Sequence, residues 1–292
     1  AFLAADLGVE VTLVDEETNP GGVCLYRGCI PSKALLHVAR VITESREAKE
    51  WGLTYGEPTI DLDKMRDWKN KVIQKLTGGL GALTRKRKIT FVQGRAKLLS
   101  SSSALVERKD GTKQTITFDH CILSTGSRPT IPGNLKLDTD RVMDSTGALA
   151  LADIPGTMLV IGGGYIGCEL GSVYSALGTK VSVVEMTPTL VPGADRDLAN
   201  VLIGQLERRF HDIMLKTKVV EMKDKGKKIE VHFEGLHVKQ AVQEFDRVLI
   251  SVGRRPNTEN LGLERSRRQL DQRGMSKIDE ERRTIETTIF AI

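Results

Sequence analysis

The sequence predicts an α/β protein with two dinucleotide-binding domains of the Rossmann type. A complete strand–glycine loop–helix–strand unit runs from Thr157 to Glu185. A partial copy of the same unit lies at residues 5–15. Short apolar strands also alternate with amphipathic helical stretches along the rest of the chain, the arrangement expected of parallel sheets that helices cover.

The complete unit contains a G-x-G-x-x-G pattern between a strand over 157–161 and a helix, written Gly162-Gly163-Gly164-Tyr165-Ile166-Gly167. Gly162 permits a tight turn, Gly164 lets the backbone approach a pyrophosphate, and Gly167 lets the helix pack closely on the strand. The helix N-terminus then binds the phosphates, and Glu185 accepts hydrogen bonds from a ribose. A merely tight βα turn is the alternative, and the flanking strand, helix and acid argue against it.

The partial copy, Ala5-Asp6-Leu7-Gly8-Val9-Glu10-Val11, is similar to residues 175–181. Each copy ends in an acid seven residues after its glycine, so Asp15 is expected to hold the ribose of a first dinucleotide as Glu185 holds the second. The glycine motif of the complete unit starts 16 residues before Gly178, and the same offset from Gly8 falls before Ala1. Since the sequence also begins without Met, we expect a fragment that lacks the first phosphate loop.

The stretch from Gly21 to Lys33 contains two cysteines, Cys24 and Cys29, separated by four residues. A short glycine-marked loop here runs into an apolar, helix-forming run, which places Cys29 near a helix N-terminus. The helix dipole and the free N–H groups there favour a thiolate. Two cysteines this close can form a small redox-active ring. A structural disulfide or a zinc pair is the alternative, but the sequence offers no second ligand pair at zinc spacing.

Composition excludes several other classes of protein. The chain has 292 residues, 4% aromatic residues and a net charge of +5. No nucleic-acid motif accompanies its basic clusters, so we interpret them as solvated faces. No apolar run approaches 18 residues and no signal peptide is visible, so we expect a cytoplasmic protein without a membrane partner. Cys121 and Cys168 are expected to be small buried residues, and the histidines to be surface or packing residues: His37, His120, His211, His232 and His237.

Periodicity predicts the remaining elements. Helices are expected over 29–50, 61–88, 145–151 and 195–209, the second interrupted at Gly78-Gly79 and Gly81 and the last capped by Asp195. Strands are expected over 11–14, 89–92, 104–106, 115–118, 121–123 and 247–252, with an alternating strand region over 213–245.

Three motifs together resemble a known family. Residues 21–33, Gly-Gly-Val-Cys-Leu-Tyr-Arg-Gly-Cys-Ile-Pro-Ser-Lys, resemble the active-site signature of the FAD-dependent pyridine nucleotide–disulfide oxidoreductases. Residues 124–129 resemble that family's turn beside FAD, and residues 253–257, Gly-Arg-Arg-Pro-Asn, resemble the turn that leaves its NAD domain. Within the family, the residues of the cysteine motif most resemble those of members that oxidise dihydrolipoyl groups of 2-oxoacid dehydrogenase complexes. Tyr26-Arg27 departs from the usual Asn-Val.

The resemblance implies a glutathione-reductase-like fold, with three-layer domains built on a parallel sheet with antiparallel crossover strands. It implies an FAD-binding domain over 1–150, an NAD-binding domain over 151–271 and a return segment over 272–292. The family's interface domain, which carries a His–Glu acid–base pair, would follow residue 292. A homodimer is therefore expected of the full-length protein, and residues 1–292 alone are expected to be inactive.

The resemblance also implies roles for single residues. Cys24 and Cys29 would form a redox disulfide, in which Cys24 meets the lipoyl domain's dithiol and Cys29 faces the flavin. Lys33 would lie near flavin N5, paired with Glu169; a helix-surface lysine is the alternative. Further cofactor contacts are implied for Gly21, Gly22, Ala96 and Val219 (both beside an adenine), Thr125, Gly126, Tyr165 (shielding the flavin), Gly253 and Arg254.

The acid at Glu185 favours a free ribose 2′-hydroxyl and repels a 2′-phosphate, and no Arg follows it in residues 186–188. The pattern therefore predicts NAD rather than NADP as the second nucleotide, with FAD as the first. Two other functions stay open. One is mercuric reductase or another NAD(P)H-dependent disulfide reductase, and the other is a non-enzymatic dinucleotide-binding module with a regulatory disulfide.

Overall fold

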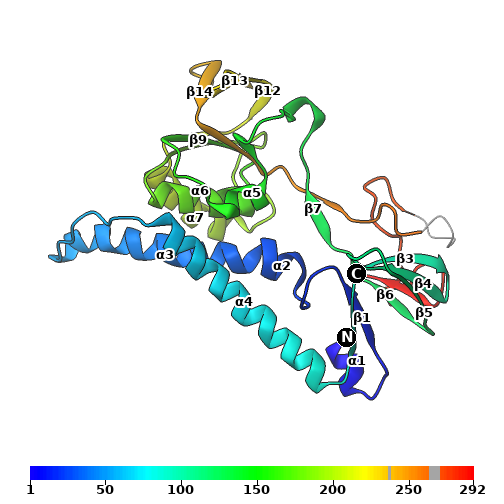
Figure 1. The fold of residues 1–292 in the computed structure, drawn as a ribbon. Coiled ribbons are helices and arrows are strands. Elements are labelled where there is room, and N and C mark those ends of the chain that lie inside the picture. Colours follow the sequence, from blue (N-terminus) through cyan, green and yellow to red (C-terminus); the bar gives the residue numbers. More distant parts are fainter. Residues whose placement is uncertain (236–237, 263–269) are drawn as a thin grey trace. The chain divides into compact units, whose positions relative to one another are not determined.

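The computed structural model describes residues 1–235, 238–262 and 270–292. The chain divides into two compact units (Figure 1). Unit 1 comprises residues 1–25, 74–128 and 255–292, and unit 2 comprises residues 26–73 and 129–254. The chain thus passes between the units four times. The predicted boundaries at 150 and 271 concern cofactor domains and stay a prediction.

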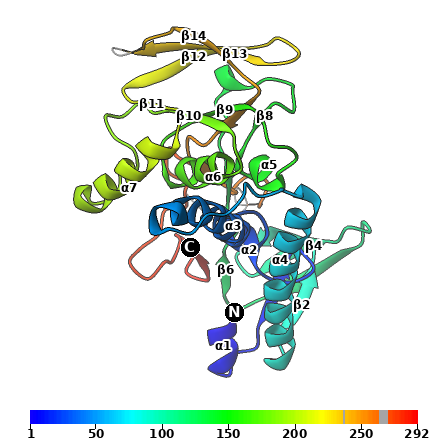
Figure 2. The ribbon, with the colours of Figure 1, turned by 90° about the vertical axis from the view of Figure 1, so that its left-hand side faces the viewer.

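A five-stranded parallel sheet forms the centre of unit 2, in the order β11 (Asp212–Met214), β10 (Lys180–Val184), β9 (Thr157–Ile161), β15 (Arg247–Ile250) and β8 (Val142–Met143). Parallel neighbours need a crossover, which α6 (Tyr165–Ala176) supplies between β9 and β10 and α7 (Arg196–Arg209) between β10 and β11 (Figure 2). This arrangement confirms the predicted Rossmann-type unit.

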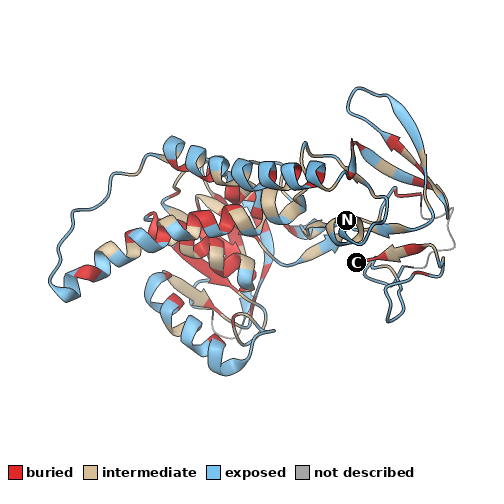
Figure 3. Cartoon of the chain, turned by 90° about the horizontal axis from the view of Figure 1, so that it is seen from below, coloured by how far each residue is buried: buried red, intermediate tan, exposed pale blue. Residues whose placement is uncertain are grey.

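Both faces of this sheet are buried. Met158 and Val160 of β9 belong to the core shared with the helices, α5 (Ser145–Ala150) and α6 among them. Leu159 and Ile161 pack instead with an antiparallel sheet of β12 (Thr217–Asp224), β13 (Ile229–Gly235) and β14 (Val242–Phe245). Successive strand residues point to opposite faces, so β9 joins both cores of a three-layer unit. Figure 3 shows the buried residues concentrated in these layers.

Two long helices precede this sheet in the sequence. Helix α3 (Cys29–Glu47) continues into a 3-10 turn, η1 (Ala48–Trp51), so the helix predicted over 29–50 is confirmed. Helix α4 (Leu62–Lys86) is continuous, and the predicted interruption is wrong. Gly78 and Gly79 each cost a helix about 1 kcal/mol relative to alanine, which does not suffice to break a helix of this length. A β-carbon on Gly81 would lie 1.9 Å from the Asn19 side-chain oxygen, so a larger residue there requires the Asn19 side chain to move.

Unit 1 consists of small sheets. β1 (Thr12–Asp15) pairs in parallel with β2 (Thr90–Gln93), and β6 (Cys121–Leu123) pairs in parallel with β17 (Ile289–Ala291). An antiparallel sheet contains β3 (Arg95–Ser100), β4 (Ser103–Glu107) and β5 (Lys113–Thr117), and a short helix, α1 (Phe2–Asp6), precedes β1. The predicted strands are present. β3 was not predicted, because its alternation of Arg95 and Lys97 with half-buried residues gives a weak apolar signal.

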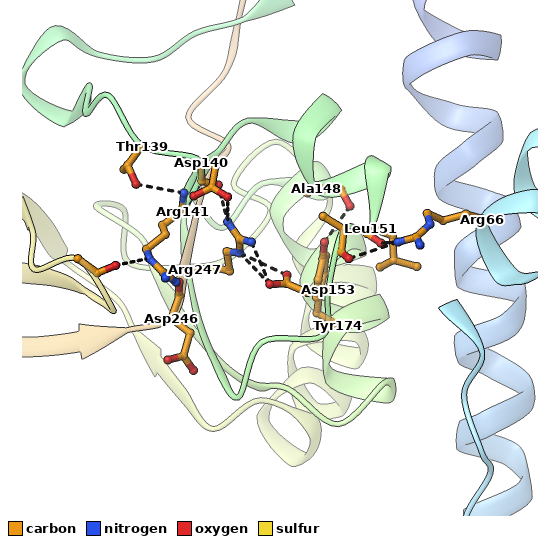
Figure 4. Close-up of polar contacts among 12 residues, drawn as sticks. Arg66, Thr139, Asp140, Arg141, Ala148, Leu151, Asp153, Tyr174, Asp246 and Arg247 are labelled. Carbon is orange, nitrogen blue, oxygen red and sulfur yellow. Dashed lines mark hydrogen bonds and ion pairs between the residues drawn. The ribbon is translucent and has the colours of Figure 1, made fainter. Parts of the chain in front are cut away.

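Charged side chains tie together the amino ends of the unit 2 strands (Figure 4). Arg247, at the start of β15, donates to the Asp153 carboxylate (Nη2–Oδ2 2.9 Å) and to the Asp140 carbonyl (Nη1–O 2.6 Å). Its side chain is only 11% exposed. The hydrogen bond to Asp153 raises the pKa of Arg247 above its ordinary value, so the guanidinium stays charged. Arg141 adds a bond from Nε to the Gly226 carbonyl (2.9 Å).

The remaining expectations have mixed outcomes. Helix α5 and the apolar strand β15 are confirmed, and Cys168 is buried as predicted, whereas Cys121 is half-buried. Asp195 occupies the N-cap position of α7, but its side chain makes no capping hydrogen bond, so the predicted cap is wrong. His237 lies outside the described residues. Among the helices that the structure describes, none is long and apolar enough to cross a membrane.

The buried hydroxyl of Tyr174 gives a stability prediction. Tyr174 is 1% exposed, its hydroxyl donates to the Ala148 carbonyl (2.9 Å), and burial raises its pKa to about 12. The unfolded chain loses this proton near pH 10 while the folded chain keeps it, so stability falls above pH 10 by about 1.4 kcal/mol per pH unit. We expect Tyr174→Phe to remove this component of the slope in urea unfolding between pH 9 and 11.5.

The control is Tyr55→Phe, because Tyr55 is 61% exposed. That variant should retain the wild-type slope. Equal slopes for Tyr174→Phe and wild type would contradict the prediction. The buried Cys168 thiol, whose pKa burial raises to about 11, titrates in the same sense in all three proteins and cancels in the comparison.

Candidate functional site

The glycine loop between β9 and α6 is built around close approaches. Gly162 has φ +104°, and a β-carbon on it would lie 2.6 Å from the Ser251 carbonyl oxygen. A β-carbon on Gly167 would lie 2.2 Å from the Gly162 carbonyl oxygen, which confirms the close helix–strand packing predicted for this glycine. Gly164, the N-cap of α6, has no atom within 4 Å of the corresponding position. The free N–H groups of the helix therefore adjoin open space that a phosphate can occupy.

Glu185 follows β10 directly and is bound to this loop. Its Oε2 accepts the Gly163 N–H (2.7 Å), and its Oε1 accepts the Thr187 N–H (2.8 Å). A carboxylate at the carboxyl end of the second strand, beside the glycine loop, has the placement that ribose recognition requires. The ribose contact itself stays a prediction.

The two cysteines lie in consecutive helices. Cys29 is the first residue of α3, with Gly28 as its N-cap, so the predicted position at a helix N-terminus is confirmed. Cys24 lies within a short helix, α2 (Gly22–Arg27), where we had expected a loop. Both side chains are exposed. The division between the units falls after Leu25, and the Cys24–Cys29 pairing stays a prediction.

Lys33 and Glu169 form the predicted ion pair, with Nζ and Oε1 2.5 Å apart. Glu169 lies on α6, and Lys33 lies one turn after Cys29 on α3. The Ser32 hydroxyl donates to the second carboxylate oxygen, Oε2, at 2.6 Å. Sequence reasoning missed this bond, although Ser32 lies beside Lys33 in the cysteine motif. The Lys33 side chain remains 58% exposed, so its ammonium group can still approach a ligand.

Unit 1 contains a hollow at the end of β1. Asp15 ends this strand, and its Oδ1 accepts the Glu17 N–H (2.9 Å). A cavity of about 390 Å³ lies nearby, lined by Glu16, Gly94, Arg95, Ala96, Lys97, Leu105, Glu107, Arg108, Lys109 and Asn260. Ala96, predicted to touch an adenine, is thus part of a cavity wall that carries four cationic side chains.

The turn predicted beside FAD is held in place by the C-terminal segment of unit 1, residues 255–292. Gly126 has φ +68°, a conformation that favours glycine. The Asn257 N–H donates to the Gly126 carbonyl (2.9 Å), and its side-chain Nδ2 donates to the Thr125 carbonyl (3.0 Å). Arg128 in turn donates to the Asn257 Oδ1 (2.8 Å). The motifs around 124–129 and 253–257 therefore form one structure.

The other predicted cofactor residues are dispersed. Tyr165 and Ile166 begin α6, and the Tyr165 side chain is 64% exposed. Val219 is buried in β12. Gly21 precedes α2, and the remaining residues are Gly22 (φ +57°), Gly253 (φ +120°) and Arg254, which begins β16 (Arg254–Pro256) opposite β7 (Ser127–Pro129). Their cofactor contacts stay predictions.

Cys168 is the other thiol close to the glycine loop. Its Sγ donates to the Gly163 carbonyl oxygen (3.5 Å), and burial raises its pKa to about 11. A thiol held in its protonated form is a poor nucleophile, so Cys168 is structural and the exposed cysteines are the reactive candidates. Among the described residues, no group of three or more His, Cys, Asp or Glu side chains is arranged to hold a metal ion.

A parallel sheet with a phosphate-binding loop, and an exposed cysteine one helical turn before a Lys–Glu pair, define a nucleotide-dependent redox protein. The family profile for "pyridine nucleotide-disulphide oxidoreductase" matches residues 1–292, and the chain belongs to that family. The dihydrolipoyl dehydrogenases of Vibrio cholerae and Haemophilus influenzae are each 42% identical to it over its whole length, and that of Bacillus subtilis is 39% identical. The chain spans about 61% of the length of these relatives.

Solved structures show the same fold. The HOCl-induced flavoprotein disulfide reductase RclA from Escherichia coli superposes with a TM-score of 0.83 at 28% identity. The match covers the whole of this chain and 62% of that protein. LpdA from Mycobacterium tuberculosis matches with a TM-score of 0.88 at 24% identity, again over the whole of this chain and 63% of the other. The predicted glutathione-reductase-like fold is thereby confirmed.

The contacts of Gly167 predict the effect of adding one methyl group. Gly167→Ala places a methyl against the Gly162 carbonyl and 2.7 Å from the Ser251 hydroxyl oxygen, both of which the loop needs in place. We expect a loss of about 1–3 kcal/mol of unfolding free energy, measured by urea denaturation. Gly204→Ala is the matched control, because Gly204 lies inside α7 with open space around it. It should be neutral or stabilising, by up to about 1 kcal/mol. Equal effects of the two changes would contradict the close-packing argument.

Proposed function

We propose that the protein is a dihydrolipoyl dehydrogenase, which oxidises dihydrolipoyl groups and reduces NAD⁺. The observation that carries the proposal is the arrangement at the start of α3. Cys29 occupies the helix N-terminus, and Lys33 one turn later pairs with Glu169 at 2.5 Å. The curated relatives that are similar along the whole chain bear this enzyme name, and dihydrolipoyl dehydrogenases are flavoproteins that use FAD and NAD.

The cysteines perform the exchange with substrate. The dithiol of the dihydrolipoyl group attacks the Cys24–Cys29 disulfide through Cys24, and the substrate leaves as a cyclic disulfide. The substrate dithiol thus gives up two electrons and two protons to the enzyme disulfide through a mixed disulfide with Cys24, which leaves Cys24 and Cys29 reduced. Cys29 occupies the positive end of the helix dipole, the position proposed for the sulfur that faces the flavin. Bound FAD would accept the two electrons from this pair and deliver them to NAD⁺.

Lys33 would supply a cation to a bound flavin. A positive charge near N5 stabilises the reduced, anionic ring. Lys33 and Ser32 donate to different oxygens of the Glu169 carboxylate. Both bonds together fix the carboxylate, which therefore orients the lysine and cannot itself move toward the ring. Lys33 and Glu169 therefore act as one positioned charge pair.

The two nucleotides occupy different units in this proposal. NAD is held in unit 2 by the glycine loop over 162–167 and by Glu185, with Val219 on the adenine side. FAD is held in unit 1, where Asp15 binds the ribose and Ala96 lines the adenine end. The cationic side chains around that cavity, Arg95 and Lys97 among them, suit the phosphates of an adenine nucleotide.

The proposal includes the partner and the setting of the enzyme. The dithiol substrate is carried by a lipoyl domain of a 2-oxoacid dehydrogenase complex, and the working protein is a cytoplasmic homodimer. These statements rest on the family resemblance and on the names of the relatives.

The decisive experiment is an assay of dihydrolipoamide-dependent NAD⁺ reduction with the protein expressed from its complete gene. Cys24→Ser and Cys29→Ser should each reduce turnover by about 10³-fold or more, because the exchange needs both sulfurs. Cys121→Ser is the control and should keep full activity, since Cys121 is a half-buried residue of β6 outside the cysteine motif of the sequence. A flavoprotein with all cysteines intact that reduces another disulfide or Hg²⁺ with NADH, but does not oxidise dihydrolipoamide, would refute the substrate. Cofactor binding without any electron transfer would refute the proposal that the protein is an enzyme.

Nucleotide choice is tested at Glu185. Glu185→Gln keeps the size of the side chain but removes the charge that repels a 2′-phosphate. We expect the preference for NAD⁺ over NADP⁺, measured as the ratio of kcat/KM values, to fall by about tenfold. An unchanged ratio would show that another group excludes NADP⁺.

A further inference from the structure

The segment that follows Glu185 folds back onto the glycine loop. We call residues 186–195 the return loop. Its Val191 N–H donates to the Gly163 carbonyl (2.9 Å), and its Thr187 N–H donates to the Glu185 carboxylate (2.8 Å). The Leu190 side chain is fully buried, and one of its methyl carbons lies 2.4 Å from the place that a β-carbon on Gly163 would take. The return loop therefore fixes both Gly163 and Glu185 from one side.

One residue of the return loop has an unfavourable backbone conformation. Val191 has φ +46°, in the left-handed region. This conformation is uncommon for any residue except glycine and is a marked outlier for a β-branched one. The surrounding structure must therefore hold Val191 in place.

Arg196, the first residue of α7, provides that hold. Its guanidinium donates to the carbonyls of Val191 (Nη2–O 2.7 Å) and Ala194 (Nη2–O 2.8 Å), and to the Thr189 hydroxyl (Nη1–Oγ1 2.5 Å). Longer bonds reach the Leu190 carbonyl from Nη1 and the Ala194 carbonyl from Nε. Within the described part of the chain Arg196 makes no ion pair, so its donors serve the return loop, through the carbonyls of Leu190, Val191 and Ala194 and the Thr189 hydroxyl.

We propose that Arg196 is a positioning residue for the nicotinamide dinucleotide site, an inference that rests on the proposed function. It holds the return loop in its strained form, and the loop in turn holds Gly163 at the pyrophosphate and Glu185 at the ribose. Without Arg196, the loop relaxes at Val191, and nucleotide binding has to restore the order that the guanidinium otherwise supplies. Affinity for NAD then falls, while the reaction at the cysteines is unaffected.

The test uses the protein expressed from its complete gene, with NAD⁺ and NADH as probes in calorimetric titration. Arg196→Ala should weaken nucleotide binding by about tenfold and raise KM for NAD⁺ in proportion, with kcat and KM for dihydrolipoamide unchanged. Arg196→Lys should recover part of the loss, because a lysine can reach only some of the acceptors. Arg208→Ala, an exposed arginine on the same helix, is the matched control and should bind as wild type.

The backbone strain at Val191 can be tested directly. Val191→Gly removes the conformational penalty, so the double variant Arg196→Ala/Val191→Gly should bind NAD⁺ within about threefold of wild type. Hydrogen exchange without nucleotide should show faster exchange across residues 187–195 in Arg196→Ala and restored protection in the double variant. These outcomes do not depend on which dithiol the enzyme uses.

Three results would overturn the inference. One is an Arg196→Ala variant that binds NAD⁺ as wild type does, and another is an additive double variant with no recovery. The third is equal loss in Arg208→Ala. A different result, a wild-type protein that binds no nicotinamide dinucleotide, would overturn the proposed function and this inference together. The first three results overturn this inference alone.

Discussion

The nucleotide-binding end of unit 2 depends on the close approach of α6 to the ends of β9 and β15. The absence of a side chain at Gly167 lets the helix come within contact of the Gly162 carbonyl. Ser251 follows β15 directly. Its hydroxyl lies within hydrogen-bond distance of two carbonyl oxygens, those of Ile161 (3.1 Å) and Gly162 (3.0 Å), and can donate to either. The Ile161 carbonyl also accepts the Ser251 N–H (2.8 Å), so the hydroxyl matters most for the Gly162 carbonyl. The helix N-terminus is thereby held at the carboxyl edge of the sheet, where phosphates are bound in folds of this type.

The same helix also positions the start of α3. Glu169 receives Ser32 and Lys33, and α3 and α6 share a core that includes Leu35, Leu170 and Val173. An ion pair as exposed as Lys33–Glu169 contributes about 0–1 kcal/mol. Each fully buried leucine contributes about 1.5–3 kcal/mol. The apolar contacts therefore hold the two helices together, and the ion pair is left to orient the lysine. Helix α6 thus carries the glycine loop at its N-terminus and also contacts the first turn of α3, which begins with Cys29.

Sequence reasoning succeeded where a single residue type has one physical reason to occur. The glycine loop and Cys29 at a helix N-terminus follow from motifs whose spacing fixes their geometry, whereas the Lys33–Glu169 pair was implied by the family resemblance. It failed where tertiary contacts decide. The glycines of α4 suggested a break, yet about 1 kcal/mol for each does not suffice to interrupt a helix of this length. Asp195 had the sequence signature of a cap, but its side chain makes no capping bond.

The return loop was the largest omission. Residues 186–195 contain two prolines and a glycine, a composition that indicates only a loop. Nothing local reveals that Val191 has a positive φ or that Arg196 bonds to the backbone behind it. Such contacts join residues through main-chain carbonyls, which carry no sequence signal. The polar residues that matter most for positioning were therefore the least visible ones.

The two arginines at opposite ends of the sheet show how placement separates function from stability. Arg247 lies at the amino end, 11% exposed, where its partners are the carboxylates of Asp153 and Asp140. A charge this poorly solvated needs such partners for the fold to persist. Arg196 lies at the carboxyl end, where ligands approach a parallel sheet, and its donors are directed to a loop rather than to a charge. Carbonyl acceptors bind more weakly than carboxylates, so the return loop is held but can still adjust when a nucleotide enters.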